Sequence, residues 1–183
     1  MTRLAIIQQA PEFLDKTKTI GEAVNYISEA AGQGAELVVF TETFIAGYPT
    51  WLWRLRPGTD WTLSETLYKR LWNNAVNMDS DDLQPLYQVA KEYGVTVVCG
   101  IEERDNTLSQ ATLYNTVITI GADGTLLNKH RKLMPTNPER MVWGFGDATG
   151  LNVVDSPAGR IGSLLCWENY MPFARYALSA HNV

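Results

Sequence analysis

One cysteine in this 183-residue sequence stands where a nucleophile would be useful. Cys166 follows an apolar run over residues 160–165 and precedes a polar break and a helical pattern. A strand that turns into a helix at a nucleophile exposes that side chain at the sheet edge and aims backbone N–H groups at the atom under attack. Taken alone, the pattern fits an inert core cysteine better, because free cysteine is among the most buried residue types.

A reactive thiol needs a base or a nearby positive charge to form a thiolate near neutral pH. The two histidines are poor candidates, because His130 lies inside a basic run and His181 is near the end of the chain. A carboxylate that takes the thiol proton and an ammonium that stabilises the resulting charge would also work. Glu42 directly follows one apolar run, and the cations of residues 129–132 follow another. The position of Glu42 is equally typical of the first solvent-exposed residue after a strand. The basic run is also typical of a solvent-exposed patch.

The order of elements around these residues predicts an α/β fold. A strand at 4–8, an amphipathic helix at 15–31 and a buried strand at 36–40 predict a parallel pair joined by a crossover helix. Glu42 would then lie at the carboxyl end of a parallel strand, the edge of open α/β sheets where ligands bind. Further helices are expected at 63–75 and 83–93, strands at 95–101, 113–120 and 125–128, and a last hairpin from strands at 151–155 and 160–165.

Several other residues have an expected place. Glu102 and Glu103 should follow the strand at 95–101, at the same edge as Glu42, and Cys99 inside that strand should be inert core. The loop over residues 44–61 is rich in aromatic residues. They could line a substrate pocket or bury a subunit contact. The candidate pocket residues are Tyr48, Trp51 and Trp53.

Composition excludes several classes of protein. The net charge is −5 with scattered basic residues, which argues against binding to nucleic acid or to an anionic membrane. Two cysteines and two histidines without a Cys-x-x-Cys pair argue against a zinc site or a disulfide framework. No apolar run approaches the length of a membrane span, and the N-terminus does not resemble a signal peptide. We therefore expect one cytoplasmic domain over residues 1–183.

Three segments resemble the motifs of the nitrilase superfamily of carbon–nitrogen hydrolases. Residues 41–49 resemble its glutamate motif, 129–136 its lysine motif and 162–172 its nucleophile motif, and in this order they are highly specific. Residues 166–169 and 138–144 resemble the nitrilase branch more than the amidase branches. Thr41 departs from the family, which often has proline there. The resemblance implies an α-β-β-α sandwich of two sheets.

By the same resemblance, Glu42 is the general base, Lys132 the cation and Cys166 the nucleophile. Glu139 matches a second carboxylate that many members place beside the lysine, and Trp167 would support the site next to the nucleophile. The implied reaction converts a small-molecule nitrile to a carboxylic acid and ammonia through a thioimidate and an acyl-enzyme, with no metal or organic cofactor. The sequence does not identify the nitrile or the ratio of acid to amide product.

The resemblance covers only the first part of the family domain. The expected strands supply one sheet and the start of a second, so an apolar sheet face would be exposed unless more protein covers it. The alternatives to a nitrilase are therefore an amidase of the same superfamily, an inactive or regulatory fragment that needs a partner, and, least favoured, a thiol redox sensor at Cys166. Family members commonly pair through the helix after the nucleophile, so we expect a homo-oligomer formed through residues 172–180.

Overall fold

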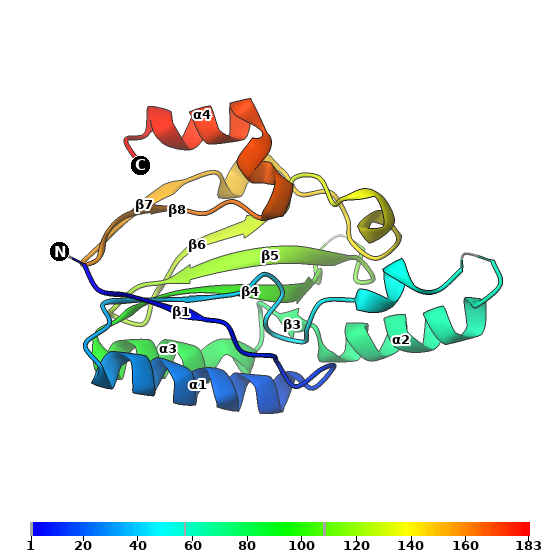
Figure 1. Cartoon of the computed structure of the whole chain (residues 1–183), viewed down its shortest axis with the longest axis horizontal. Coiled ribbons are helices and arrows are strands. Elements are labelled where there is room, and N and C mark those ends of the chain that lie inside the picture. The colour runs from blue at the N-terminus through cyan, green and yellow to red at the C-terminus, as the bar shows by residue number, and fades with distance from the viewer. Residues whose placement is uncertain (1, 57, 108) are drawn as a thin grey trace.

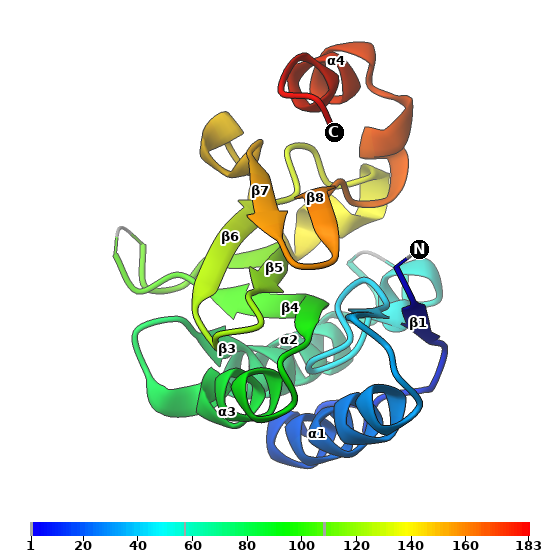
Figure 2. The same cartoon turned by 90° about the vertical axis from the view of Figure 1, so that its left-hand side faces the viewer.

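The protein is described by a computed structural model that covers residues 2–56, 58–107 and 109–183. One six-stranded mixed sheet forms its centre. Helices α1 (Lys16–Gly32) and α3 (Gln84–Tyr93) cover one face, and a second, two-stranded sheet with helix α4 (Pro172–Ala180) lies over the other (Figures 1 and 2). The chain therefore has the layers of a partial α-β-β-α sandwich.

The main sheet has a parallel half and an antiparallel half. Its strand order is β1 (Leu4–Ile7), β2 (Leu37–Phe40), β4 (Thr96–Arg104), β5 (Leu113–Ile120) and β6 (Leu126–Arg131), and β3 (Val76–Asn77) pairs with the end of β4. β1, β2 and β4 are parallel, whereas β4, β5 and β6 are antiparallel. The predicted parallel pair and the predicted 113–128 hairpin are confirmed, but β3 was not predicted.

Local signals set the helix boundaries. The Asp15 side chain accepts a hydrogen bond from the Lys18 backbone N–H, which caps α1. Gly94 ends α3 in the left-handed conformation, with φ of 63°. Helix α2 (Trp61–Asn74) lies to the side of the main layers (Figure 1).

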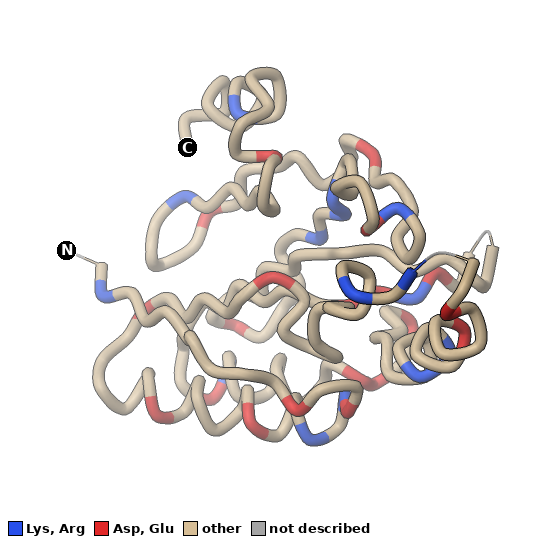
Figure 3. The backbone as a smooth tube through the Cα atoms, turned by 45° about the vertical axis from the view of Figure 1, so that its right-hand side comes forward, with Lys and Arg blue, Asp and Glu red and all other residues tan. Residues whose placement is uncertain are grey.

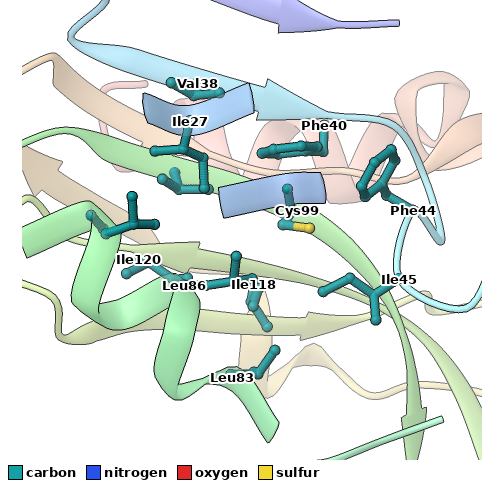
Figure 4. Close-up of a cluster of buried hydrophobic side chains, with 14 of the residues drawn as sticks. Ile27, Val38, Phe40, Phe44, Ile45, Leu83, Leu86, Cys99, Ile118 and Ile120 are labelled. Atoms are coloured by element: carbon teal, nitrogen blue, oxygen red, sulfur yellow. The ribbon is translucent and has the colours of Figure 1, made fainter. Parts of the chain in front are cut away.

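The main core lies between the sheet and the helices α1 and α3. Figure 4 shows Ile27, Phe40, Cys99 and Ile118 packed together in this layer. Cys99 is fully buried, and burial raises the pKa of its thiol, so the expectation of an inert core cysteine is confirmed.

Several strand boundaries differ from the prediction. β6 runs to Arg131, so residues 129–131 lie inside the strand that they were expected to follow. The strand expected at 160–165 is shorter: β7 (Val153–Ser156) and β8 (Gly159–Gly162) form the hairpin, and pairing ends where Gly162 meets Val153. Glu102 and Glu103 do not follow their strand but lie within β4, because β5 continues to pair with it as far as Arg104.

The inner face of the main sheet is not covered along its first strand. Leu4 and Ile6 of β1 are 54% and 63% exposed, whereas Val98 and Val117, which lie opposite the β7–β8 hairpin, are nearly buried. Acidic and basic positions are interspersed along the chain (Figure 3). No helix among the described residues has the length and apolarity needed to cross a bilayer.

Candidate active site

The turn that carries Glu42 lies directly against β4. After β2 ends, Thr43 takes a left-handed conformation with φ of 49°. The Ile45 N–H donates to the Gly100 carbonyl, and the Glu102 N–H donates to the Ile45 carbonyl, each at 3.1 Å. A side chain at Gly100 would collide with the backbone of residues 41–43, so glycine permits this close approach.

Lys132 follows β6 and points inward. Its side chain is 1% exposed, and its Nζ lies 2.9 Å from Glu42 Oε1 and 2.8 Å from Glu139 Oε2. Burial would lower the pKa of Lys132, but its hydrogen bonds and charge interactions with the two carboxylates outweigh burial and raise the pKa above its ordinary value. Lys132 is therefore a buried cation held between two carboxylates, and not part of a solvated patch.

Glu139 is held from three sides. It lies in the short 3₁₀ helix Asn137–Met141, where its Oε2 accepts the Thr136 N–H at 2.7 Å. Its Oε1 accepts the Tyr48 hydroxyl at 2.7 Å. Burial and the Glu139 carboxylate raise the pKa of Tyr48, so this phenol remains a neutral donor.

The three predicted pocket residues lie in two different places in the structure. Tyr48 contacts Glu139, and Trp53 donates from Nε1 to the Tyr48 hydroxyl at 3.0 Å. Trp51 instead lines a mainly apolar cavity of about 540 Å³ with Trp61, Tyr68 and other residues of α2 and the 141–142 segment.

Cys166 lies at a sharp turn. Its φ is 52°, a conformation that costs free energy in a non-glycine residue, and it begins the 3₁₀ helix Cys166–Tyr170. The Cys166 side chain is exposed, and together with Glu42 it lines a groove of about 430 Å³ between the main sheet and β8. Trp167 is 58% exposed and packs on the ring of Tyr170.

A buried carboxylate joins the lysine segment to the cysteine turn. Glu168 accepts hydrogen bonds from the Leu133 N–H at 2.7 Å, the Leu165 N–H at 2.6 Å and His130 Nε2 at 3.0 Å. Leu133 follows Lys132, and Leu165 precedes Cys166. Because both His130 and Glu168 are fully buried, this contact fixes the two segments relative to each other.

Sequence reasoning missed two residues that hold the site together, Asn115 and Glu168. Asn115 on β5 donates from Nδ2 to Glu42 Oε1 at 2.6 Å. Glu168 lies within the nucleophile motif of residues 162–172, but the resemblance gave it no role. A polar residue inside an apolar strand was the available signal for Asn115. The described residues contain no group of three or more histidine, cysteine or acidic side chains arranged to hold a metal ion.

Comparison with known proteins identifies the family. The family model described as carbon-nitrogen hydrolase matches residues 3–183. The chain is 38% identical over 182 residues to a bifunctional nitrilase/nitrile hydratase of Lupinus angustifolius, covering 99% of the chain and 51% of that protein. It is 39% identical over 176 residues to an aliphatic nitrilase of Rhodococcus rhodochrous, covering 96% of the chain and 46% of that protein. An arylacetonitrilase of Aspergillus niger is 38% identical over 177 residues, covering 95% of the chain and 49% of that protein.

Solved structures share the fold at lower identity. Nit3 of Saccharomyces cerevisiae, a member of the nitrilase superfamily, superposes with a TM-score of 0.76 at 23% identity, covering 98% of the chain and 60% of Nit3. The chain spans about half the length of the curated relatives it matches.

Proposed function

Because the chain belongs to the carbon–nitrogen hydrolase family, we propose that it carries the catalytic centre of a nitrilase-type hydrolase. The reaction would convert a nitrile and two water molecules to a carboxylic acid and ammonia. The observation that carries the proposal is the buried Lys132 ammonium between Glu42 and Glu139, beside a groove that Glu42 shares with the exposed Cys166 thiol. This arrangement supplies a base, a cation and a nucleophile at one edge of the sheet.

Glu42 is the proposed general base. Lys132 and Asn115 both donate to its Oε1, so the other oxygen, Oε2, is the one to accept the Cys166 thiol proton. The thiolate attacks the nitrile carbon and a C–S bond forms. The nitrile nitrogen takes the proton from Glu42, which gives a thioimidate and restores the Glu42 carboxylate. Two contacts occupy two of the three N–H donors of Lys132, which leaves one for the charge that develops during attack.

Hydrolysis then proceeds through two water molecules. The first water adds to the thioimidate carbon and the C–N bond breaks. Ammonia leaves, and a thioester remains on Cys166. The second water, deprotonated by Glu42, attacks the thioester carbonyl, and the C–S bond breaks to release the acid and the thiol. The left-handed turn at Cys166 would direct the backbone N–H of Trp167 toward the charged intermediates. Glu139 and Tyr48 hold Lys132 in place.

An amidase of the same superfamily is the second candidate, because an amide would form the same thioester on Cys166. Relatives named for aliphatic nitriles and for arylacetonitriles are almost equally similar to this chain, so identity does not select a nitrile. The proposed pocket residues Tyr48, Trp51 and Trp53 are compatible with either class.

Turnover measurements distinguish these candidates. Ammonia and acid release should be followed with an aliphatic nitrile, an arylaliphatic nitrile and the matching amides. Cys166→Ala should abolish the release of ammonia from nitriles, and retained turnover would rule out Cys166 as the nucleophile. Glu42→Gln should stop turnover while the circular dichroism spectrum stays unchanged, whereas an unfolded variant would favour a structural role for Glu42. Faster turnover of amides than of nitriles would favour the amidase.

A fragment that needs a partner remains a further candidate, and the exposed Leu4 and Ile6 on the inner sheet face support it. The isolated 183-residue chain should then be aggregated, bound to a partner or inactive. A monodisperse, active monomer would contradict this candidate.

A further inference from the structure

Two neighbouring glutamates on β4 have opposite surroundings. Glu103 is ion-paired: Lys129 Nζ and Arg131 Nη2 each lie 2.7 Å from its Oε1, and the Thr116 hydroxyl donates to its Oε2. Burial would raise the pKa of Glu103, but the hydrogen bonds from Arg131 and Lys129 outweigh burial and lower it. Glu103 is therefore an ionised carboxylate.

Glu102 points to the other face of the sheet, as alternation along a strand requires. It is fully buried, and its Oε2 accepts a hydrogen bond from Trp143 Nε1 at 2.6 Å. Its Oε1 is buried and has no hydrogen-bond partner among the described residues. A buried ionised carboxylate with an unpaired oxygen would be costly.

Asn115 lies directly opposite Glu102 in the antiparallel pair of β4 and β5. Side chains of directly opposed residues lie on the same face and close enough to interact. Asn115 Nδ2 donates to Glu42, and its Oδ1 is buried and has no partner in the described part of the chain. Within the described residues, two buried oxygens, one on each opposed side chain, therefore lack a donor.

We propose that Glu102 is a neutral carboxylic acid whose Oε1–H donates to Asn115 Oδ1, so that the Asn115 amide presents its N–H to Glu42. A single proton would give both unpartnered oxygens a hydrogen bond. It would also set the donor-to-acceptor direction of the two hydrogen bonds that run from Glu102 through Asn115 to Glu42. An ionised Glu102 would instead compete with Glu42 for the same amide N–H. Glu102 is thus a positioning residue, and this functional role rests on the proposed function of Glu42.

The charged groups around Glu102 favour its neutral form. Burial raises the pKa of Glu102 well above its ordinary value, and the negative charges of Glu42 and Glu139 raise it further, against the hydrogen bond from Trp143. Lys132 faces the ring of Trp143 at 5.6 Å but is already paired with those two carboxylates. Tyr68 of α2 adds no charge, because burial raises the pKa of its phenol and keeps it neutral.

Infrared spectroscopy of the chain at neutral pH tests the proton directly. A protonated carboxyl group has a C=O stretch above the amide I region, and Glu102→Gln should remove one such band. Glu103→Gln is the matched control and should leave the band in place, because Glu103 is ionised. An identical band in the parent and in Glu102→Gln would overturn the proposal.

Turnover tests the positioning role. A glutamine can accept from Trp143 and donate to Asn115, so Glu102→Gln should keep kcat within about twofold of the parent, with every hydrogen bond retained. Glu102→Leu should lower kcat by about tenfold with little change in KM, because it removes the hydrogen bond that orients Asn115 and no contact with the substrate. Equal loss in both variants would overturn the donor role. A parent that turns over neither nitrile nor amide would overturn the proposed function, while the infrared band would still report on Glu102.

Discussion

The Lys132 ammonium lies 2.9 Å from Oε1 of Glu42, although their strands, β6 and β2, are separated in the sheet by β4 and β5. The contact is possible because both residues lie just past the ends of their strands and Lys132 points inward with its side chain 1% exposed. The Lys132 N–H donates to the Asn115 carbonyl at 2.8 Å, which fixes the backbone from which the lysine extends. Two segments 90 residues apart thus form one charged centre.

Removing the central cation should impair both stability and turnover. Lys132→Met leaves Glu42 and Glu139 unpaired beside each other, so the free energy of unfolding should fall by about 3 kcal/mol. The kcat should fall at least about a hundredfold, because charge developing in the transition state loses its cation. Chemical denaturation and ammonia release measure the two effects.

Lys129→Met provides the matched control. Lys129 is also paired with a glutamate, but its side chain is 33% exposed and it points away from the groove side of the sheet toward Glu103. Its loss should cost no more than about 1 kcal/mol. Equal effects of the two substitutions on kcat would contradict the role given to Lys132.

Gly100 tests how closely the Glu42 turn must approach β4. A methyl group at this position would collide with the Thr41 carbonyl, the Thr43 N–H and the Glu42 backbone. Gly100→Ala should therefore displace Glu42, lower the free energy of unfolding by about 1–3 kcal/mol and reduce turnover.

Gly21→Ala is the control for this substitution, since it lies in α1 with nothing within 4 Å of the added methyl group. It should be neutral or stabilise by up to about 1 kcal/mol, because alanine favours a helix over glycine. Unfolding curves and kcat for both variants check the pair. Unchanged turnover in Gly100→Ala would show that the turn has room to move.

The sequence predicted the strands that carry Glu42 and Lys132 better than it predicted the residues that hold these side chains in place. Apolar runs indicated the strands that carry Glu42 and Lys132, and motif resemblance selected Lys132 from four basic residues. Asn115 and Glu168 depend instead on strand register and on which segments meet across the sheet. Periodicity shows which face a residue occupies, but it does not show its neighbour on the next strand. The same reason explains why Glu102 and Glu103 were expected beyond a strand that in fact contains them.

Glu168 should make stability depend on acid pH. Burial would raise its pKa, but hydrogen bonds from His130 and from the Leu133 and Leu165 N–H groups outweigh burial and lower it. A lowered folded-state pKa adds stability that is complete above the unfolded-state pKa of about 4.3 and is lost as pH falls through the folded-state value.

Glu168→Gln should therefore cost about 3 kcal/mol at pH 7, and the difference from the parent should shrink below about pH 4. Denaturant unfolding at several pH values measures this difference. The exposed Glu92→Gln on α3 is the control and should follow the parent curve. A difference in unfolding free energy between Glu168→Gln and the parent that is independent of pH would contradict the role given to the ionised Glu168 carboxylate.

Helix α4 should mediate self-association. Tyr170, Phe173 and Tyr176 are 77%, 89% and 72% exposed, a cluster of aromatic side chains of the kind enriched at interfaces. Phe173→Glu should shift the molar mass measured by light scattering toward the monomer. Lys18→Glu, on the exposed face of α1, should leave the molar mass unchanged. An unchanged mass in Phe173→Glu would place the association elsewhere.

The most direct test of the central claim is the mass of the covalent intermediate. An active preparation should be mixed with a nitrile, quenched in acid and examined by intact-protein mass spectrometry and peptide mapping. We predict an added acyl or imidoyl group on the peptide that contains Cys166, absent in Cys166→Ala, and none on Cys99, whose thiol is buried with a raised pKa. An adduct on another residue, or ammonia release by Cys166→Ala at the parent rate, would contradict the account.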